Sequence, residues 1–252
     1  MKVNVSLGAL PCYRFEEAII TALEGLSEPA LGELSTNHLQ LCPQNLGYLS
    51  EELATEIARK YPSQFRLHAN VRVLPKMIFS DASNFKDNQE WFVQAGKVSQ
   101  LLNAPAYTVH AGDRANCDLL TMFDNVRAME DMFCCDVGVE GLYPTKSNKY
   151  LLSNWNEYST LLDSGIKYAL DLSHLNIVVH HSGKQETGLV SELLQSENCI
   201  EVHLSGNDGE GDSHSALDNS VWWFDLLNKA NPKATLFSEG NQRADIRARR
   251  NH

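Results

Sequence analysis

Short apolar segments alternate with longer amphipathic ones along most of the chain. The short segments are continuous apolar runs or alternate with the two-residue period of a strand, whereas the longer ones have the three- and four-residue spacing of a helix. Strands are predicted at 2–7, 31–41, 66–73, 106–110, 136–140, 167–171, 200–203 and 234–239. Helices are predicted at 14–26, 51–60, 87–102, 117–133, 154–162, 186–194 and 220–230. This alternation, with short connections, predicts an α/β fold, a single (β/α)8 TIM barrel whose active site lies at the carboxyl ends of its strands.

No boundary between domains is visible. The 252 residues suit one barrel, and the chain has no Ser/Gly-rich or Pro-rich linker and no low-complexity run. We therefore predict one domain over 1–252, with 240–252 as a basic tail.

The composition of the chain limits its expected binding partners and cellular compartment. The net charge of -11 gives no general attraction to nucleic acid or anionic membranes, although bound metal would supply local positive charge. The six cysteines show neither a C-x-x-C motif nor a disulfide pattern, and we expect reduced thiols. We see no signal peptide and no apolar run of the ~18 residues that a membrane span needs. These features predict a cytoplasmic protein with no membrane contact.

Residues that can bind metal stand at or near the ends of six consecutive predicted strands. Three more follow in adjoining segments, one of them three residues after a strand end and two in the polar loop after 200–203. The nine are His68, His110, Glu140, Asp171, His174, His203, Asp212, His214 and Glu239. Any one of them alone is more often a solvated or capping residue. Nine N and O donors at one rim exceed the ligands of one cation, so we predict two or three divalent metal ions, with Glu140 as a bridge.

Three further polar residues are candidates for contacting a substrate. Asp113 and Arg114 follow the strand at 106–110, and Asn207 lies in the loop after 200–203. We expect them to bind substrate.

From His68 to Asn241 the chain resembles the xylose-isomerase-like barrels. These include endonuclease IV, the sugar isomerases and epimerases, and the multinuclear non-haem iron oxidative enzymes of the methanobactin-biosynthesis type. The epimerases use a Glu, Asp, His, Glu quartet on one metal. By this resemblance Glu140, Asp171, His203 and Glu239 are the expected catalytic residues.

The iron enzymes are most similar around the last two strands. Their His-Leu-Ala-Gly, Asp-Thr-His and Thr-Leu before Glu are similar to His203-Leu-Ser-Gly206, Asp212-Ser-His214 and Thr235-Leu-Phe-Ser-Glu239. The resemblance implies an iron-dependent enzyme that uses O2 to modify a peptide presented by a small partner protein. Iron is the expected metal, with zinc or manganese as alternatives.

Two other enzyme classes remain open. All nine donors have counterparts in endonuclease IV, which implies a zinc-dependent endonuclease for abasic sites, although the chain offers few basic residues to hold DNA, namely Arg72, Lys76 and Arg114. A single-metal sugar isomerase or epimerase would use the extra donors to bind hydroxyl groups. A binding barrel without turnover is the least attractive alternative, because the convergent charges would destabilise an empty site.

Overall fold

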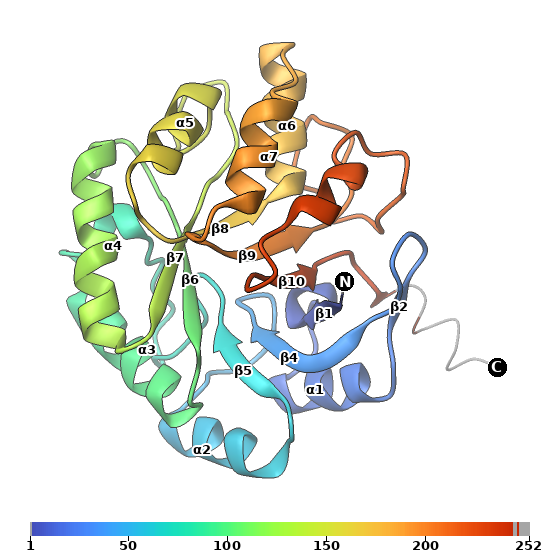
Figure 1. The fold of residues 1–252 in the computed structure, drawn as a ribbon. Coiled ribbons are helices and arrows are strands. Elements are labelled where there is room, and N and C mark those ends of the chain that lie inside the picture. The colour runs from blue at the N-terminus through green and yellow to red at the C-terminus, as the bar shows by residue number, and fades with distance from the viewer. Residues whose placement is uncertain (1, 244–245, 247–252) are drawn as a thin grey trace.

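Eight parallel strands curve around one axis, and helices cover their outer side (Figure 1). The computed structural model describes residues 2–243 and residue 246. The strands follow the order β5-β4-β1-β10-β9-β8-β7-β6. Their bounds are β1 Val3–Ser6, β4 Ser35–Leu41, β5 Gln64–Leu67, β6 Ala106–His110, β7 Asp136–Glu140, β8 Tyr168–Asp171, β9 Cys199–Leu204 and β10 Thr235–Ser238. The predicted TIM barrel is confirmed.

The barrel closes between β5 and β6 through few contacts. In the described chain, the parallel bridge between His68 and Thr108 joins these two edges, and the Ala69 amide donates to the Thr108 carbonyl over 2.7 Å. The other seven neighbouring pairs are hydrogen-bonded ladders. The β5–β6 seam is therefore the weakest joint of the barrel.

Helices fill the connections and begin at polar caps. Ser50, Asp118 and Asn154 each accept a hydrogen bond from a backbone amide of the first turn of a following helix. The helices are α1 Phe15–Leu23, α2 Glu51–Lys60, α3 Gln89–Leu101, α4 Leu119–Phe133, α5 Trp155–Asp163, α6 Leu172–Ser182 and α7 Thr187–Gln195. Their apolar faces pack on the strands to form one continuous core.

Three predicted segments differ from the structure, and one helix was not predicted. The segment 31–41 holds the end of a small hairpin, β2 Ser27–Glu28 with β3 Gly32–Glu33, before β4 begins. The strand predicted at 66–73 lies earlier, as β5. The segment 220–230 forms a 3-10 helix, η3 Phe224–Lys229, in place of an α-helix. Helix α6 was not predicted, because it follows β8 without any connecting loop.

The predicted tail at 240–252 lies largely outside the described residues. Its described beginning packs on the barrel, since Gln242 is buried and its amide donates to the Ala9 carbonyl over 2.9 Å.

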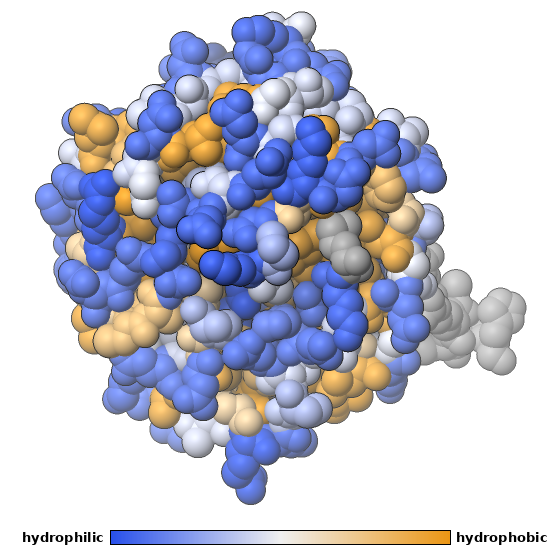
Figure 2. Space-filling view, in the orientation of Figure 1, coloured by the Kyte–Doolittle hydropathy of each residue, from blue (hydrophilic) through white to orange (hydrophobic). Residues whose placement is uncertain are grey.

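The polar surface and the free cysteines of the structure agree with the composition of the chain. Hydrophilic side chains cover much of the face in Figure 2, with smaller apolar patches between them. The six cysteines are free thiols. Within the described chain, every helix is too short or too polar to cross a bilayer.

A glycine at the carboxyl end of the barrel provides a test of the local packing. Gly112 has φ +94°, and a Cβ there would lie 2.1 Å from Asp81 Oδ1, whereas Gly165 has φ +72° and open space. We expect Gly165→Ala to cost about 1 kcal/mol of unfolding free energy, from the left-handed backbone alone. Gly112→Ala should cost about 3 kcal/mol, because the clash adds to that cost. Equal losses in urea denaturation would contradict this.

Candidate metal centre

Strand register brings the predicted metal donors together. In the β6–β7 ladder His110 is paired with Glu140, and in the β8–β9 ladder Asp171 is paired with His203. Paired residues of neighbouring strands project to the same side of a sheet. Glu239 follows β10, where its amide donates to the Leu204 carbonyl over 2.9 Å. These side chains therefore meet at the carboxyl ends of the strands.

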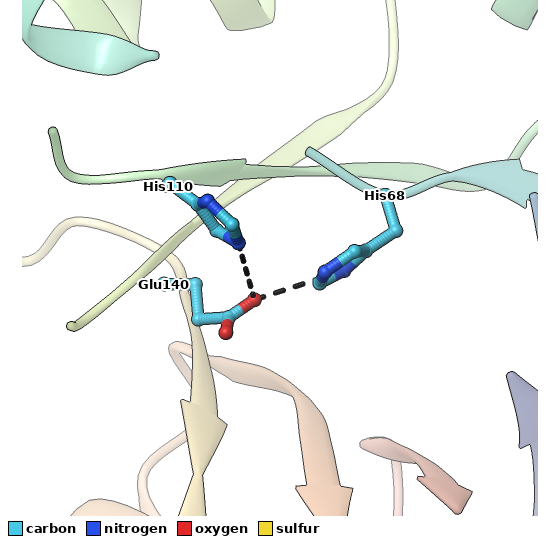
Figure 3. Close-up of side chains that lie close together, drawn as sticks. All are labelled: His68, His110 and Glu140. Atoms are coloured by element: carbon cyan, nitrogen blue, oxygen red, sulfur yellow. Dashed lines mark ion pairs between the residues drawn. The ribbon is translucent and has the colours of Figure 1, made fainter. Parts of the chain in front are cut away.

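Three imidazoles surround one oxygen of Glu140. Its Oε2 lies 3.2 Å from His203 Nδ1, 3.7 Å from His68 Nδ1 and 3.9 Å from His110 Nε2. Figure 3 shows His68 and His110 pointing toward this carboxylate from two different strand ends. Glu140 itself is fully buried. Its position suits the bridging role predicted for it.

The two carboxylate oxygens of Asp171 make different contacts, one with the start of α6 and one with the site. Oδ1 accepts hydrogen bonds from the amides of Ser173 and His174, at 2.7 and 3.1 Å, and so caps α6. Oδ2 faces the site, 3.5 Å from His174 Nε2. The cap fixes the carboxylate, and the first turn of α6 then carries His174 to 3.6 Å from Glu140 Oε1. Strand end and helix start thus supply two donors in one rigid unit.

The loop after β9 adds the remaining pair. Asp212 Oδ2 lies 2.9 Å from His214 Nε2 and 3.3 Å from His174 Nε2. His214 has φ +44°, an uncommon backbone for a residue other than glycine, beside the paired backbones of Gly206 and Ser215. Its Nδ1 lies 3.7 Å from Glu239 Oε2. All nine predicted donors therefore form one connected cluster.

The donor set fits divalent cations. Three subsets have ligand atoms within 4.8 Å of one another, namely His68, His110 and Glu140, then His68, His203 and Glu239, and then Glu140, Asp171 and His174. Four buried donor atoms of these sets have no hydrogen-bond partner in the described chain: His68 Nδ1, Glu140 Oε2, Asp171 Oδ2 and His203 Nδ1. Buried polar atoms rarely lack a partner, and a cation would satisfy all four. Mixed imidazole and carboxylate ligands suit zinc, iron and manganese.

Electrostatics divide the histidines into two kinds. Burial lowers the pKa of His68 to about 3 and also lowers that of His110, so both are neutral and ready to bind metal. Burial opposes protonation of His174 and His214 as well, but Asp171 and Asp212 raise the pKa of His174 to about 10, and Asp212 and Glu239 raise that of His214 to about 9. Burial raises the pKa of Glu239 to about 7. In the metal-free protein, protons on His174, His214 and Glu239 therefore supply part of the positive charge that metal ions would bring.

A cavity of about 390 Å³ opens over these donors, and we call it the metal cavity. Seven of the nine donors line it, while Asp171 and His203 lie deeper. Phe79, Asp81, Tyr143 and Tyr150 contribute to its walls, and Lys149 is the one lysine or arginine among its lining residues in the described chain. The volume suits a small ligand.

The three residues predicted to contact substrate are paired with other residues of the fold. Arg114 pairs with both oxygens of Glu157, and Asp113 accepts from the Ala115 amide over 2.8 Å. Asn207 exchanges hydrogen bonds with Asn176 and Ser173. The described lining of the metal cavity contains none of these three predicted residues.

Sequence reasoning missed polar residues beneath the cluster. Arg66 stands two residues before His68 and Glu201 two residues before His203, so each shares an inward face with a donor. That two-residue spacing along a strand could have identified Arg66 and Glu201 from the sequence. Lys149 carries no such signal, because it lies in an irregular loop after β7.

Comparison with solved structures supports the fold class. A D-tagatose 3-epimerase-like protein matches with TM-score 0.67 and 16% identity, covering 99% of this chain and 95% of that one. A family 2 AP endonuclease from Brucella melitensis matches with TM-score 0.63 and 14% identity, covering 95% and 93%. A xylose isomerase domain protein from Alicyclobacillus acidocaldarius matches with TM-score 0.50 and 11% identity, covering 81% and 80%. No protein-family model and no curated protein sequence matches the chain.

These neighbours confirm the (β/α)8 barrel, and at identities below one fifth they show the fold alone. The resemblance to the xylose-isomerase-like enzymes stays a prediction. The neighbours give no support to the narrower resemblance to the iron enzymes.

Mutation of Asp212 and His214 tests how many ions the cluster binds. We expect Asp212→Ala with His214→Ala to lower the metal content by one ion per chain and to leave the circular dichroism spectrum unchanged. Glu210→Ala, an exposed carboxylate in the same loop, serves as the control and should keep every ion. Elemental analysis of protein purified without chelator measures this. Full metal content in the double variant would exclude the pair as ligands.

Metal affinity should rise with pH. A cation must displace the protons of His174 and His214, whose pKa values are about 10 and 9. The apparent affinity for the ion at these residues should increase about tenfold per pH unit for each proton displaced, between pH 6 and 9. Titrations against a chelating indicator at three pH values measure this, and an affinity independent of pH would contradict it.

The metal-free protein should show the opposite trend in stability. Because the folded pKa values of these histidines lie above the unfolded value of 6.5, their stabilising contribution is complete below pH 6.5 and is lost as pH rises through 9 and 10. We expect a lower Tm at pH 9.5 than at pH 6.5 in the presence of chelator. The Asp212→Ala, His214→Ala variant should lose part of this dependence.

Proposed function

We propose that the chain is a multinuclear metal-dependent enzyme that hydrolyses a phosphate ester of a small substrate. The observation that carries the proposal is the single cluster of nine donors, in which the carboxylates of Glu140 and Glu239 each contact two or more of the imidazoles. A single-metal epimerase needs only the quartet Glu140, Asp171, His203 and Glu239. Two or three ions are the arrangement that phosphoester hydrolases use.

The residues around the cluster suit a small anionic substrate. When bound, the ions would polarise the phosphoryl oxygens and lower the pKa of a bound water. Lys149 lines the metal cavity, and its half-exposed ammonium group can bind a phosphoryl oxygen. This group lies 3.6 Å from Asp113 Oδ2 and 5.1 Å from the centroid of the Tyr150 ring. Phe79, Tyr143 and Tyr150 offer apolar walls for the rest of the ligand.

Duplex DNA suits this site less well than a small molecule. The family 2 AP endonuclease shares the fold, but this chain carries a net charge of -11 and places one lysine at the metal cavity. DNA binding depends on many basic contacts with phosphates. A nucleotide or sugar phosphate is the size that the cavity volume supports.

Iron-dependent oxidation of a peptide is the second candidate. It is favoured by the local similarity of His203–Gly206, Asp212–His214 and Thr235–Glu239 to the iron enzymes, because all three segments contribute donors to the cluster. In that case the chain would need O2 and a small partner protein that presents the peptide.

One set of assays separates the candidates. Protein stripped of metal is reloaded with zinc, manganese or anaerobic ferrous iron. Each form is assayed on bis(para-nitrophenyl) phosphate, an abasic duplex, a ketohexose and, with O2 uptake recorded, a cysteine-containing peptide. Phosphate ester hydrolysis that needs metal supports the proposal. Turnover of only the ketohexose or O2 would replace it with epimerisation or oxidation.

Lys149 provides a mutational test. We expect Lys149→Ala to raise KM for the phosphate ester about tenfold, which corresponds to roughly 1.4 kcal/mol, because it removes a charge that binds substrate. Lys146→Ala, in the same loop but exposed and away from the cavity lining, is the matched control. Equal KM values for the two variants would exclude this role for Lys149.

A further inference from the structure

A buried ion pair lies inside the barrel directly beneath the metal centre. Arg66 of β5 and Glu201 of β9 face each other across the interior, with Nη1 and Oε1 2.9 Å apart. Their side chains are 4% and 0% exposed. Burying two charges is costly, and apolar side chains of similar size would often serve stability as well or better. The pair therefore calls for an explanation beyond folding.

The carboxylate of this pair contacts a predicted metal ligand from behind. Glu201 Oε2 lies 3.2 Å from His203 Nε2, whereas the other ring nitrogen, Nδ1, lies 3.2 Å from Glu140 Oε2 on the metal side. The two-residue spacing along β9 puts both side chains on the same inward face. An imidazole that donates its Nε2 proton to Glu201 keeps Nδ1 free to bind a cation.

Other buried contacts fix the position of Glu201. Gln40 Nε2 donates to Oε2 over 2.6 Å, and Arg66 holds Oε1. Arg66 in turn donates to Thr235 Oγ1 over 3.3 Å. Arg66 and Thr235 line a separate cavity of about 780 Å³ at the amino-terminal mouth, whereas Glu201 lines neither this cavity nor the metal cavity. The carboxylate is thus held in place and shielded from water.

We propose that Glu201, held by Arg66, is a positioning residue of the metal centre that fixes the ring of His203 with Nδ1 toward the cation. This inference rests on the proposed metal centre, and it extends that centre to the middle of the barrel. Carboxylates that orient a metal-bound histidine commonly change metal affinity by about 10- to 100-fold.

The decisive variant removes both charges together. Arg66→Met with Glu201→Leu leaves no unpaired buried charge, so the fold and Tm should be preserved or improved. We expect one ion per chain to bind about 10- to 100-fold more weakly, while the remaining ions keep their affinity. Lys167→Met with Glu130→Leu removes a partly exposed ion pair of 2.8 Å, whose lysine lines the cavity at the amino-terminal mouth; this control should bind all ions as the natural chain does.

A spectroscopic readout separates positioning from a general packing effect. In the zinc-loaded natural chain, the Nε2 proton of His203 should give a slowly exchanging imidazole resonance in proton-nitrogen NMR spectra. That resonance should disappear or exchange rapidly in the Arg66→Met, Glu201→Leu variant. The conservative Glu201→Gln change keeps an acceptor and should restore the resonance and part of the affinity.

The outcomes distinguish this inference from the proposed function. If the natural chain binds no divalent ion, the metal centre itself is wrong. If it binds ions and the double variant binds them equally well, Arg66 and Glu201 are only a structural pair. If the double variant does not fold, the zinc-loaded natural chain decides, because the absence of a slowly exchanging Nε2 proton on His203 would overturn the proposal.

Discussion

Four carboxylates gathered in a largely buried space are the constraint on which the rest of this structure depends. Glu140, Asp171 and Glu239 are almost entirely buried, and Asp212 lies beside them. Carboxylates at such distances repel one another, and burial removes the water that would screen them. Positive charge must therefore enter the cluster, as protons on His174, His203 and His214 or as metal ions. The five histidines make either solution available.

The barrel satisfies this constraint because several short, rigid segments each position one or two of the charged side chains. Strand register sets His110 beside Glu140 and Asp171 beside His203. Asp171 ends a strand, begins a helix and still presents one oxygen to the site. Because the donors belong to the scaffold itself, little conformational entropy is lost when a cation binds.

The sequence was sufficient to predict the barrel and to select nine residues that the fold gathers into one cluster. It was sufficient because donors at strand ends need only the order of strands, and parallel strands bring equivalent ends together. The bounds of β5 and the 3-10 helix η3 could not be predicted, since local patterns do not fix where tertiary packing ends an element. Helix α6 was missed because a strand that runs directly into a helix leaves no loop to mark the change.

The lining of the metal cavity was harder to predict than the cluster of metal-binding side chains. Asp113, Arg114 and Asn207 have the right chemistry, but each bonds to its own neighbours in the fold. Lys149 reaches the cavity from a long irregular loop whose path has no period in the sequence. Loops position side chains through three-dimensional contacts, and a single sequence does not contain those contacts in readable form.

The thin seam between β5 and β6 has a consequence for how the barrel opens. His68 stands at the β5 side of this seam, and His110 ends β6 on the other side. An ion held by both imidazoles and by Glu140 would link the β5 and β6 sides of the seam, where the fewest backbone hydrogen bonds join neighbouring strands. Loading the metal would then reinforce a closure that otherwise rests on few backbone contacts, so that metal binding and the integrity of the barrel would depend on the same bonds.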